Sequence, residues 1–304
     1  MTEYKSKTVL IERRYSMLHL RQLTSSDLPF ADSLRATVGW NQTIQDWQRL
    51  LEIEPTGCFV AEWDGSPAGT ATTTCYGPDL AWIGMVLVHP DFRRHGIGKA
   101  LLNHCLDYLK KRGIRCVKLD ATSLGKTLYD RLGFQDEWPL ARWETAGLSM
   151  GHGPSSTVYD GQVRPLKNSD WDALLKLDTD IFGVSRAEIL KKLAWNSLQV
   201  LALEERPGEL RGYGMLRAGA KADYLGPVVS TWREGAASLI RALFSVSEKK
   251  SFLWDIPDQT DDACELAQQM GFIRQRPLIR MALGQNSHPG RPQHQYAIAD
   301  PATG

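Results

Sequence analysis

The sequence predicts an α/β protein built from two domains of the same fold. Segments typical of buried strands alternate with segments of helical periodicity in each half of the 304 residues. Short motifs of the first half also return in the second at a nearly constant offset. The chain is long enough to bury one large core or two medium ones, and the repeat favours two.

The clearest strand, loop and helix lie in residues 80–113. LAWIGMVLVHP, residues 80–90, is apolar, contains β-branched residues and ends at a proline, as expected of a strand buried on both faces. A glycine-rich loop follows, and Gly113, after a basic KKR, is typical of a helix C-cap. Between them the apolar residues recur at helical spacing, namely Ala100, Leu101, Leu102, Cys105, Leu106 and Leu109.

The next residues predict a second strand and a short helix. IRCVKLDAT, residues 114–122, alternates apolar and polar side chains. TLYDRLGF, residues 127–134, predicts a helix that ends at Gly133. Strands that alternate with helices in this way indicate an α/β sheet.

The loop RRHGIGK, residues 93–99, has the features of an anion-binding site. A helix N-terminus offers free backbone N–H groups and a partial positive charge, and glycines let the backbone approach a bulky anion. Arg93, Arg94 and Lys99 add charged donors. We therefore expect the loop to hold a pyrophosphate.

Two common nucleotide loops do not fit these residues, and a third does. A P-loop would need a glycine at Arg93 and a hydroxyl at Ala100, and a dinucleotide loop would need a glycine at Leu101. VLVHPDFRRHGIGKALL instead resembles the acyl-coenzyme A loop of the GNAT superfamily of N-acyltransferases, whose signature is [Q/R]-x-x-G-x-[G/A]. Here that signature is Arg93-Arg94-His95-Gly96-Ile97-Gly98.

This resemblance covers about residues 18–145 and implies both a fold and a co-substrate. Each domain would have a mixed, mostly antiparallel central sheet flanked by helices, with a bulge in the strand before the loop. Acetyl-CoA would be the co-substrate. The residues implied in its binding are Met85, Val86, Leu87, Val88, Arg93, Arg94, His95, Gly96, Ile97, Gly98 and Lys99.

The resemblance also implies catalytic groups. Tyr129, four residues before Gly133-Phe134, would act as the general acid toward the leaving thiolate. The backbone N–H of Val86 would stabilise the thioester oxygen. An ammonium group must lose a proton before it attacks, but the strand LAWIGMVLV has no carboxylate. Asp79 is the candidate base, directly or through water, and a group from the second half remains an alternative.

The second half repeats the first without its chemistry. Arg164 lies 143 positions after Arg21, Gly212 lies 143 after Gly69, and Gly271 lies 138 after Gly133. The predicted domains are residues 1–150 and 151–304, joined by a linker rich in glycine and serine. The second half lacks the glycine pair and has Ala267 in place of the tyrosine. With DTDIFGVSR at residues 178–186, it resembles the tandem acetyltransferases of the YitH and HolE type, whose second domain closes over the acceptor.

The resemblance makes an N-acetyltransferase acting on the primary amine of a small molecule the main hypothesis. Trp40, Trp82 and Asp178 are candidate acceptor-binding residues, although each is also typical of a core or ion-pair position. Acetylation of a protein lysine or N-terminus remains an alternative. So does an acyl-CoA sensor without turnover, which the missing carboxylate would favour.

Composition limits the partners and the location. A formal charge of +1 gives no reason to expect a nucleic-acid or membrane partner. The five cysteines have no metal-binding or disulfide spacing, and we expect no metal. Without a signal peptide or an apolar span, a cytoplasmic monomer or homodimer is expected.

Overall fold

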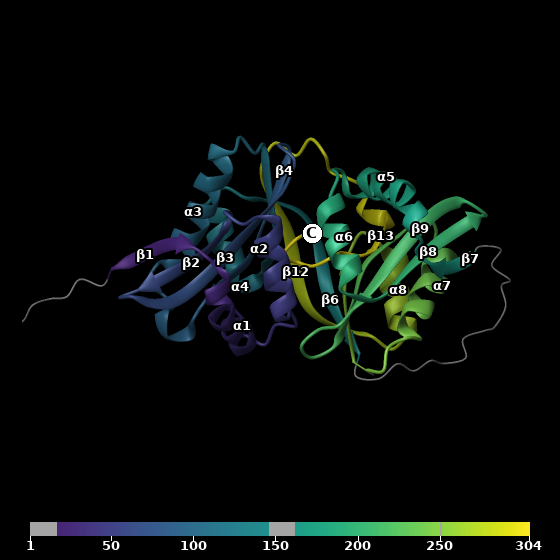
Figure 1. The fold of residues 1–304 in the computed structure, drawn as a ribbon, viewed down its shortest axis with the longest axis horizontal. Coiled ribbons are helices and arrows are strands. Elements are labelled where there is room, and N and C mark those ends of the chain that lie inside the picture. The colour runs from purple at the N-terminus through teal and green to yellow at the C-terminus, as the bar shows by residue number, and fades with distance from the viewer. Residues whose placement is uncertain (1–16, 146–161, 250) are drawn as a thin grey trace, which may run out of the picture.

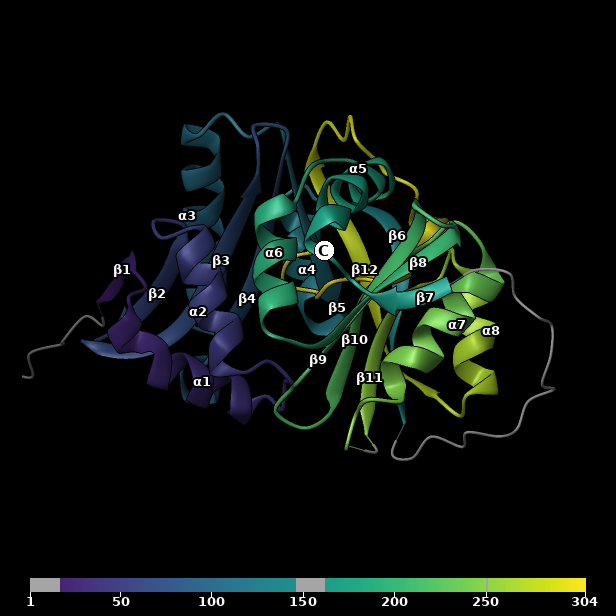
Figure 2. The ribbon, with the colours of Figure 1, turned by 45° about the vertical axis from the view of Figure 1, so that its right-hand side comes forward.

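A computed structural model of the protein describes residues 17–145, 162–249 and 251–304. The predicted domain boundary at residues 150 and 151 and most of the predicted linker lie outside these ranges. A single long sheet, mixed and mostly antiparallel, runs through the molecule with helices on both faces (Figures 1 and 2). The predicted fold class is thereby confirmed.

The elements follow the same order in both halves. The strands of the first half are β1 (Leu18–Gln22), β2 (Cys58–Trp63), β3 (Ser66–Tyr76), β4 (Leu80–Val88), β5 (Cys116–Thr122) and β6 (Gln135–Thr145), and its helices are α1 (Leu28–Thr37), α2 (Ile44–Ile53), α3 (Ile97–Lys111) and α4 (Ser123–Arg131). Those of the second half are β7 (Gln162–Pro165), β8 (Ser197–Arg206), β9 (Glu209–Arg217), β10 (Asp223–Ser230), β11 (Phe252–Pro257), β12 (Ile273–Gly284), α5 (Trp171–Phe182), α6 (Ala187–Trp195), α7 (Arg233–Phe244) and α8 (Asp261–Gln269). A short strand, β13 (Gln295–Ala297), follows.

The predicted repeat extends to individual ion pairs. Arg21 of β1 binds Asp27, at the start of α1, and Glu62 of β2, with N to O distances of 2.8 and 2.7 Å. Asp27 also accepts the backbone N–H of Thr24 and so caps the turn that leads into α1. The same interactions return in the second half among Arg164, Asp170, Glu204 and Lys167.

The sheet of each half contains the last strand of the other half. The strand order is β1-β2-β3-β4-β5-β12-β6-β11-β10-β9-β8-β7. Strand β12, from the second half, lies between β5 and β6 of the first, and β6 in turn pairs with β11. The two repeats have therefore exchanged their final strands, and β6 and β12 lie side by side in the middle of the molecule (Figure 1).

The helices cover the sheet in the pattern that their apolar residues predict. Helices α3 and α4 pack on one face of the first half, and α1 and α2 pack on the other. The predicted apolar stripe of α3 is buried, including Leu101, Cys105 and Leu109. Helix α4 begins four residues before the predicted helix, because the Thr122 hydroxyl accepts the backbone N–H of Gly125 and caps it there.

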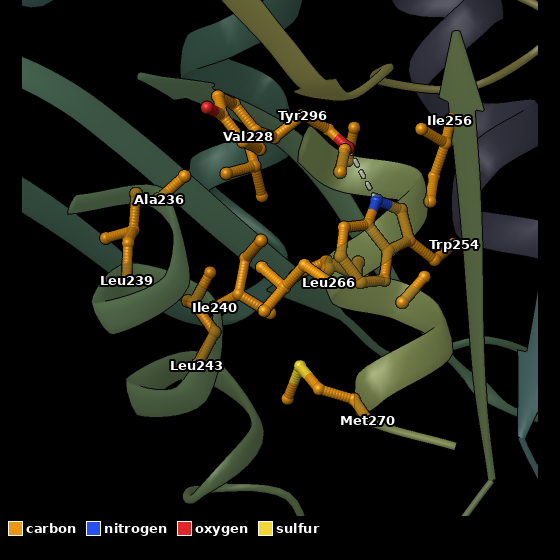
Figure 3. Packing of buried hydrophobic residues seen from close by; sticks show 14 of the residues in the cluster. Val228, Ala236, Leu239, Ile240, Leu243, Trp254, Ile256, Leu266, Met270 and Tyr296 are labelled. Atoms are coloured by element: carbon orange, nitrogen blue, oxygen red, sulfur yellow. Dashed lines mark hydrogen bonds between the residues drawn. The ribbon is translucent and has the colours of Figure 1, made fainter. Parts of the chain in front are cut away.

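In the second half, the chain itself fills the gap between the diverging strands β10 and β11. These strands pair only at residues 223–225 and 252–254, and β13 then pairs with β10 on the inner side. The indole N–H of Trp254 donates to the carbonyl of Tyr296 at 2.6 Å, as Figure 3 shows, and Ile298 N donates to Asp255 O at 3.1 Å. Aliphatic side chains of α7 and α8 pack around this contact (Figure 3).

The length and composition of the helices decide whether one of them could span a bilayer. Helix α3, with 15 residues, is the longest in the described ranges. None of the helices described is long and apolar enough to span a bilayer.

Candidate active site

A bulge interrupts β4 where the sequence predicts it. The pairing of β3 with β4 shifts register between Thr70 and Thr72, and Met85 has a φ of +50°. The hydroxyl of Thr70 donates to the carbonyl of Met85 at 2.9 Å and helps to hold this conformation. A bulge redirects the backbone groups next to it, and Val86, directly after Met85, has no partner in the register of β3 with β4.

Strands β4 and β5 then diverge. They pair in parallel only through residues 80–82 and 116–118. A small cavity of about 70 Å³ lies beyond this point. It is lined by Trp40, Gln42, Ile83, Gly84, Met85, Val86, Leu119, Asp120, Thr122, Tyr129, Arg142, Arg276, Leu278, Pro301 and Ala302.

The glycine-rich loop joins the bulged strand to the N-terminus of α3. Gly96 precedes the helix with a φ of +80°, a conformation that glycine adopts without strain. A Cβ at this position would have no protein atom within 4 Å, so the backbone faces open space. Arg93, Arg94, His95 and Lys99 are all exposed around it. These features fit a pyrophosphate at the helix N-terminus.

Tyr129 lies in the cavity wall on α4. Its ring packs edge-on against Phe134 at 6.0 Å, and it also covers Gly125, where a Cβ would come within 2.8 Å of the ring. Burial, with a smaller contribution from Cys105, raises the pKa of Tyr129 to about 12. None of the hydrogen bonds found in the described ranges involves its hydroxyl. The phenol therefore keeps its proton at neutral pH and is free to donate it.

Asp79 does not lie with this group. It precedes β4 at the end opposite the bulge, where it pairs with Arg115 and, at 3.6 Å, with His288. Six residues of extended strand separate it from Met85, a distance of about 20 Å. It is not among the cavity-lining residues.

The three candidate acceptor residues have different environments. Trp40 lines the cavity. Trp82 is fully buried outside it, donates its indole N–H to the carbonyl of Pro301 at 3.1 Å and stacks with Arg280 at 4.4 Å. Asp178 is buried in a pair of 2.9 Å hydrogen bonds with Arg186 and also accepts the hydroxyl of Tyr213. These contacts give Trp82 and Asp178 structural roles.

Several polar residues of the cavity do not figure among the sequence-based candidates. Asp120 of β5 accepts two hydrogen bonds from Arg280 of β12, at 2.8 and 2.9 Å. Burial raises the pKa of Asp120, although the Arg280 charge opposes that rise. Alternation along residues 114–122 could have singled out Asp120. Arg276 could not have been found, because only the strand exchange brings it to this cavity.

A segment near the end of the chain forms another wall. The carbonyls of Thr303 and Pro301 accept hydrogen bonds from Tyr76 and Trp82, at 2.6 and 3.1 Å. Ala302 packs against Gly84 so closely that a Cβ on Gly84 would lie 2.5 Å from the Ala302 oxygen. This segment therefore closes the cavity on the side of α1 and α2.

Within the described ranges, no three His, Cys, Asp or Glu side chains are arranged to hold a metal ion.

Comparison with known proteins identifies both halves. Residues 20–134 match the family described as "Acetyltransferase (GNAT) family", and residues 174–297 match the one described as "Acetyltransferase (GNAT) domain". The two matches together span most of the chain. The glycine-rich loop and Tyr129 fall inside the first match.

Curated relatives agree with these matches. The chain is 24% identical to an uncharacterized N-acetyltransferase, YitH, of Bacillus subtilis over 74% of this chain and 77% of that protein. It is 34% identical to an uncharacterized N-acetyltransferase of Methanocaldococcus jannaschii, over 34% of this chain and about half (49%) of the relative. Over 61 residues, 19% of this chain and 41% of the relative, it is 38% identical to the ribosomal protein bS18-alanine N-acetyltransferase of Escherichia coli.

Solved structures share the whole architecture. A proposed acetyltransferase of Pyrococcus horikoshii aligns over 100% of both chains with a TM-score of 0.78 and 22% identity. A tandem GNAT protein from the clavulanic acid biosynthesis pathway aligns over 88% of this chain and 98% of its own, with a TM-score of 0.67 and 14% identity. At these identities the likeness concerns the fold.

Proposed function

Because the chain belongs to the GNAT superfamily of N-acetyltransferases and carries two such domains in tandem, we propose that it moves an acetyl group from acetyl-CoA to the primary amine of a small molecule. The amine attacks the thioester directly, with both substrates bound. One observation carries the proposal: the bulge of β4 and Tyr129 line a single cavity, which residues of the second half help to close, and the glycine-rich loop follows β4 directly.

The coenzyme would lie along the first half. The open space at Gly96 and the exposed cations of the loop suit its pyrophosphate. The gap between β4 and β5 would take the pantetheine arm, which backbone groups of residues 86–88 on the β5 side of β4 would bind. The equivalent gap of the second half holds β13, which supports a single coenzyme site per chain.

Two groups of the first half would stabilise the transition state of acetyl transfer. The Val86 N–H, next to the bulge, would donate to the thioester oxygen as negative charge develops there. The Tyr129 phenol, protonated at neutral pH, would donate its proton to the sulfur as the C–S bond breaks.

The amine also needs a proton acceptor. Asp79 stands too far from the bulge, and we therefore assign this role to Asp120. Asp120 is the carboxylate among the described residues that line the cavity. Each of its oxygens holds one hydrogen bond from Arg280 and keeps another lone pair for the ammonium proton.

The walls of the cavity support a small acceptor. Strand β12 and the Pro301–Ala302 segment lie across the side that an extended peptide would need to cross. A second candidate function, acetylation of a protein N-terminus, is favoured by the 61-residue likeness to the alanine N-acetyltransferase. That likeness covers only part of the coenzyme-binding half.

The test is release of free coenzyme A thiol from acetyl-CoA in the presence of amines. The panel would contain amino acids, polyamines, aryl amines, aminoglycosides, lysine peptides and a peptide with an N-terminal alanine. We expect turnover with a small amine and none with peptides. Peptide turnover alone would favour the second function, and coenzyme binding without any transfer would favour a sensor.

A further inference from the structure

Arg276 carries an uncompensated positive charge in the cavity. It lies on β12 opposite Arg142 of β6, and both line the cavity. Its Nε atom is buried and has no hydrogen-bond partner in the described part of the chain. A buried donor that lacks an acceptor destabilises a protein by about 1–3 kcal/mol, and more when it is charged. A ligand that supplied the acceptor would remove that cost.

The two neighbouring carboxylates, Asp255 and Asp120, are hydrogen-bonded to other arginines and not to Arg276. Arg142 donates two hydrogen bonds to Asp255, at 2.8 and 2.5 Å. Asp120 is bound in the same two-pronged way by Arg280. Burial and the nearby charge of Arg142 lower the pKa of Arg276, although the charge of Asp255 opposes that fall. The cavity is therefore electropositive at its β12 side.

We infer that Arg276 binds an oxyanion of the acceptor, so that the amines accepted by this protein carry a carboxylate or a phosphate group. This inference rests on the proposed function and adds the substrate class to it. A guanidinium binds either oxyanion through two parallel N–H donors. The amine would lie near Val86 and Tyr129, the oxyanion at Arg276, and the apolar body of the acceptor against Trp40 and Leu278.

The experiment compares acceptors that differ only in the anion. Alanine, leucine and phenylalanine are each matched with their amide and with the amine that lacks the carboxyl group, and O-phosphoethanolamine is matched with ethanolamine. Calorimetry on protein saturated with coenzyme A gives the binding constants, and thiol release from acetyl-CoA gives kcat and KM. The proteins are wild type, Arg276→Gln, Arg276→Lys and the control Arg274→Gln.

The control removes the same charge from the same strand. Arg274 is exposed, pairs with Asp258 at 2.6 Å and does not line the cavity. We expect wild type and Arg274→Gln to bind an anionic acceptor at least about tenfold more tightly than its neutral match, since hydrogen bonds to charged groups have this strength. Arg276→Gln should abolish that preference and leave the KM for acetyl-CoA unchanged. Arg276→Lys should keep part of it.

The outcomes separate this inference from the proposed function. Equal binding of neutral and anionic acceptors to wild type would overturn the inference, and so would no measurable binding of any anionic acceptor at millimolar concentration. The inference would also be overturned if Arg276→Gln kept the preference for anionic acceptors while its KM for acetyl-CoA rose. Anion-dependent binding without thiol release would keep the inference and overturn the proposed function. Because wild type alone gives the first comparison, the test holds even if a variant does not fold.

Discussion

Replacing Tyr129 with phenylalanine should slow acetyl transfer without destabilising the fold. General acid catalysis contributes about 10²- to 10⁴-fold to a rate, equivalent to roughly 3–5 kcal/mol of transition-state stabilisation. The lost hydroxyl has no hydrogen-bond partner in the described ranges, and the ring contacts with Phe134 and Gly125 remain. We therefore expect kcat to fall by at least about a hundredfold while the free energy of unfolding changes by less than about 0.5 kcal/mol.

Tyr76→Phe is the matched control. Its buried hydroxyl donates to the carbonyl of Thr303 at 2.6 Å, and its loss leaves that carbonyl unpaired at a cost of about 1–3 kcal/mol. Thiol release and thermal unfolding would be measured for both variants. A Tyr129→Phe protein that keeps kcat within threefold of wild type would refute the assignment.

The Tyr129→Phe variant should also differ from wild type in how its stability depends on pH. Burial raises the pKa of Tyr129 from 10.0 in the unfolded chain to about 12 in the folded protein. The phenol therefore contributes stability below pH 10, and that contribution is lost as the pH rises toward 12. Urea unfolding should show wild type losing stability relative to Tyr129→Phe across this interval, and an unchanged difference would contradict the assigned burial.

Three further predictions concern the loop, the base and the strand exchange. Gly96→Ala should strain a backbone of φ +80° and weaken coenzyme binding in calorimetry by about tenfold, whereas Gly113→Ala, strained similarly at +72° but remote from the loop, should not. Asp120→Asn and Asp178→Asn should both lower the unfolding free energy by about 3–5 kcal/mol by leaving a buried arginine unpaired, but only the first should change the pH profile of kcat. The two predicted domains, expressed as separate chains, should copurify because β6 and β12 complete each other's sheets; independent elution on gel filtration would contradict the exchange.

The sequence predicts well whatever depends on neighbours along the chain. The strand before the loop, the apolar stripe of α3 and the repeat of Arg21 at Arg164 are all local patterns, and the structure contains them. The bulge and Tyr129 line one cavity because β4 and β5 are neighbours in the sheet and α4 follows β5 directly.

Predictions that depend on contacts between distant parts of the chain are less accurate. Trp82 was assigned to the acceptor side from its strand alone, but packing against Arg280 and Pro301, both from the second half, places it in the core. Arg276 reaches the cavity only through the exchange of β12, and no local pattern records which strand lies beside which. Asp79 does not line the cavity, because most of the length of β4 separates it from the bulge.

The exchange of final strands also sets the order in which this protein is completed during synthesis. Asp120 and its partner Arg280 are 160 residues apart in the chain, so β5 lacks its β12 neighbour until residues 278–284 have left the ribosome. At translation rates of about 5–20 residues per second, the incomplete edge would persist for roughly 10 to 30 s. A nascent first half therefore presents an unpaired strand edge, of the kind that recruits chaperones or aggregates, for far longer than a domain that completes its own sheet.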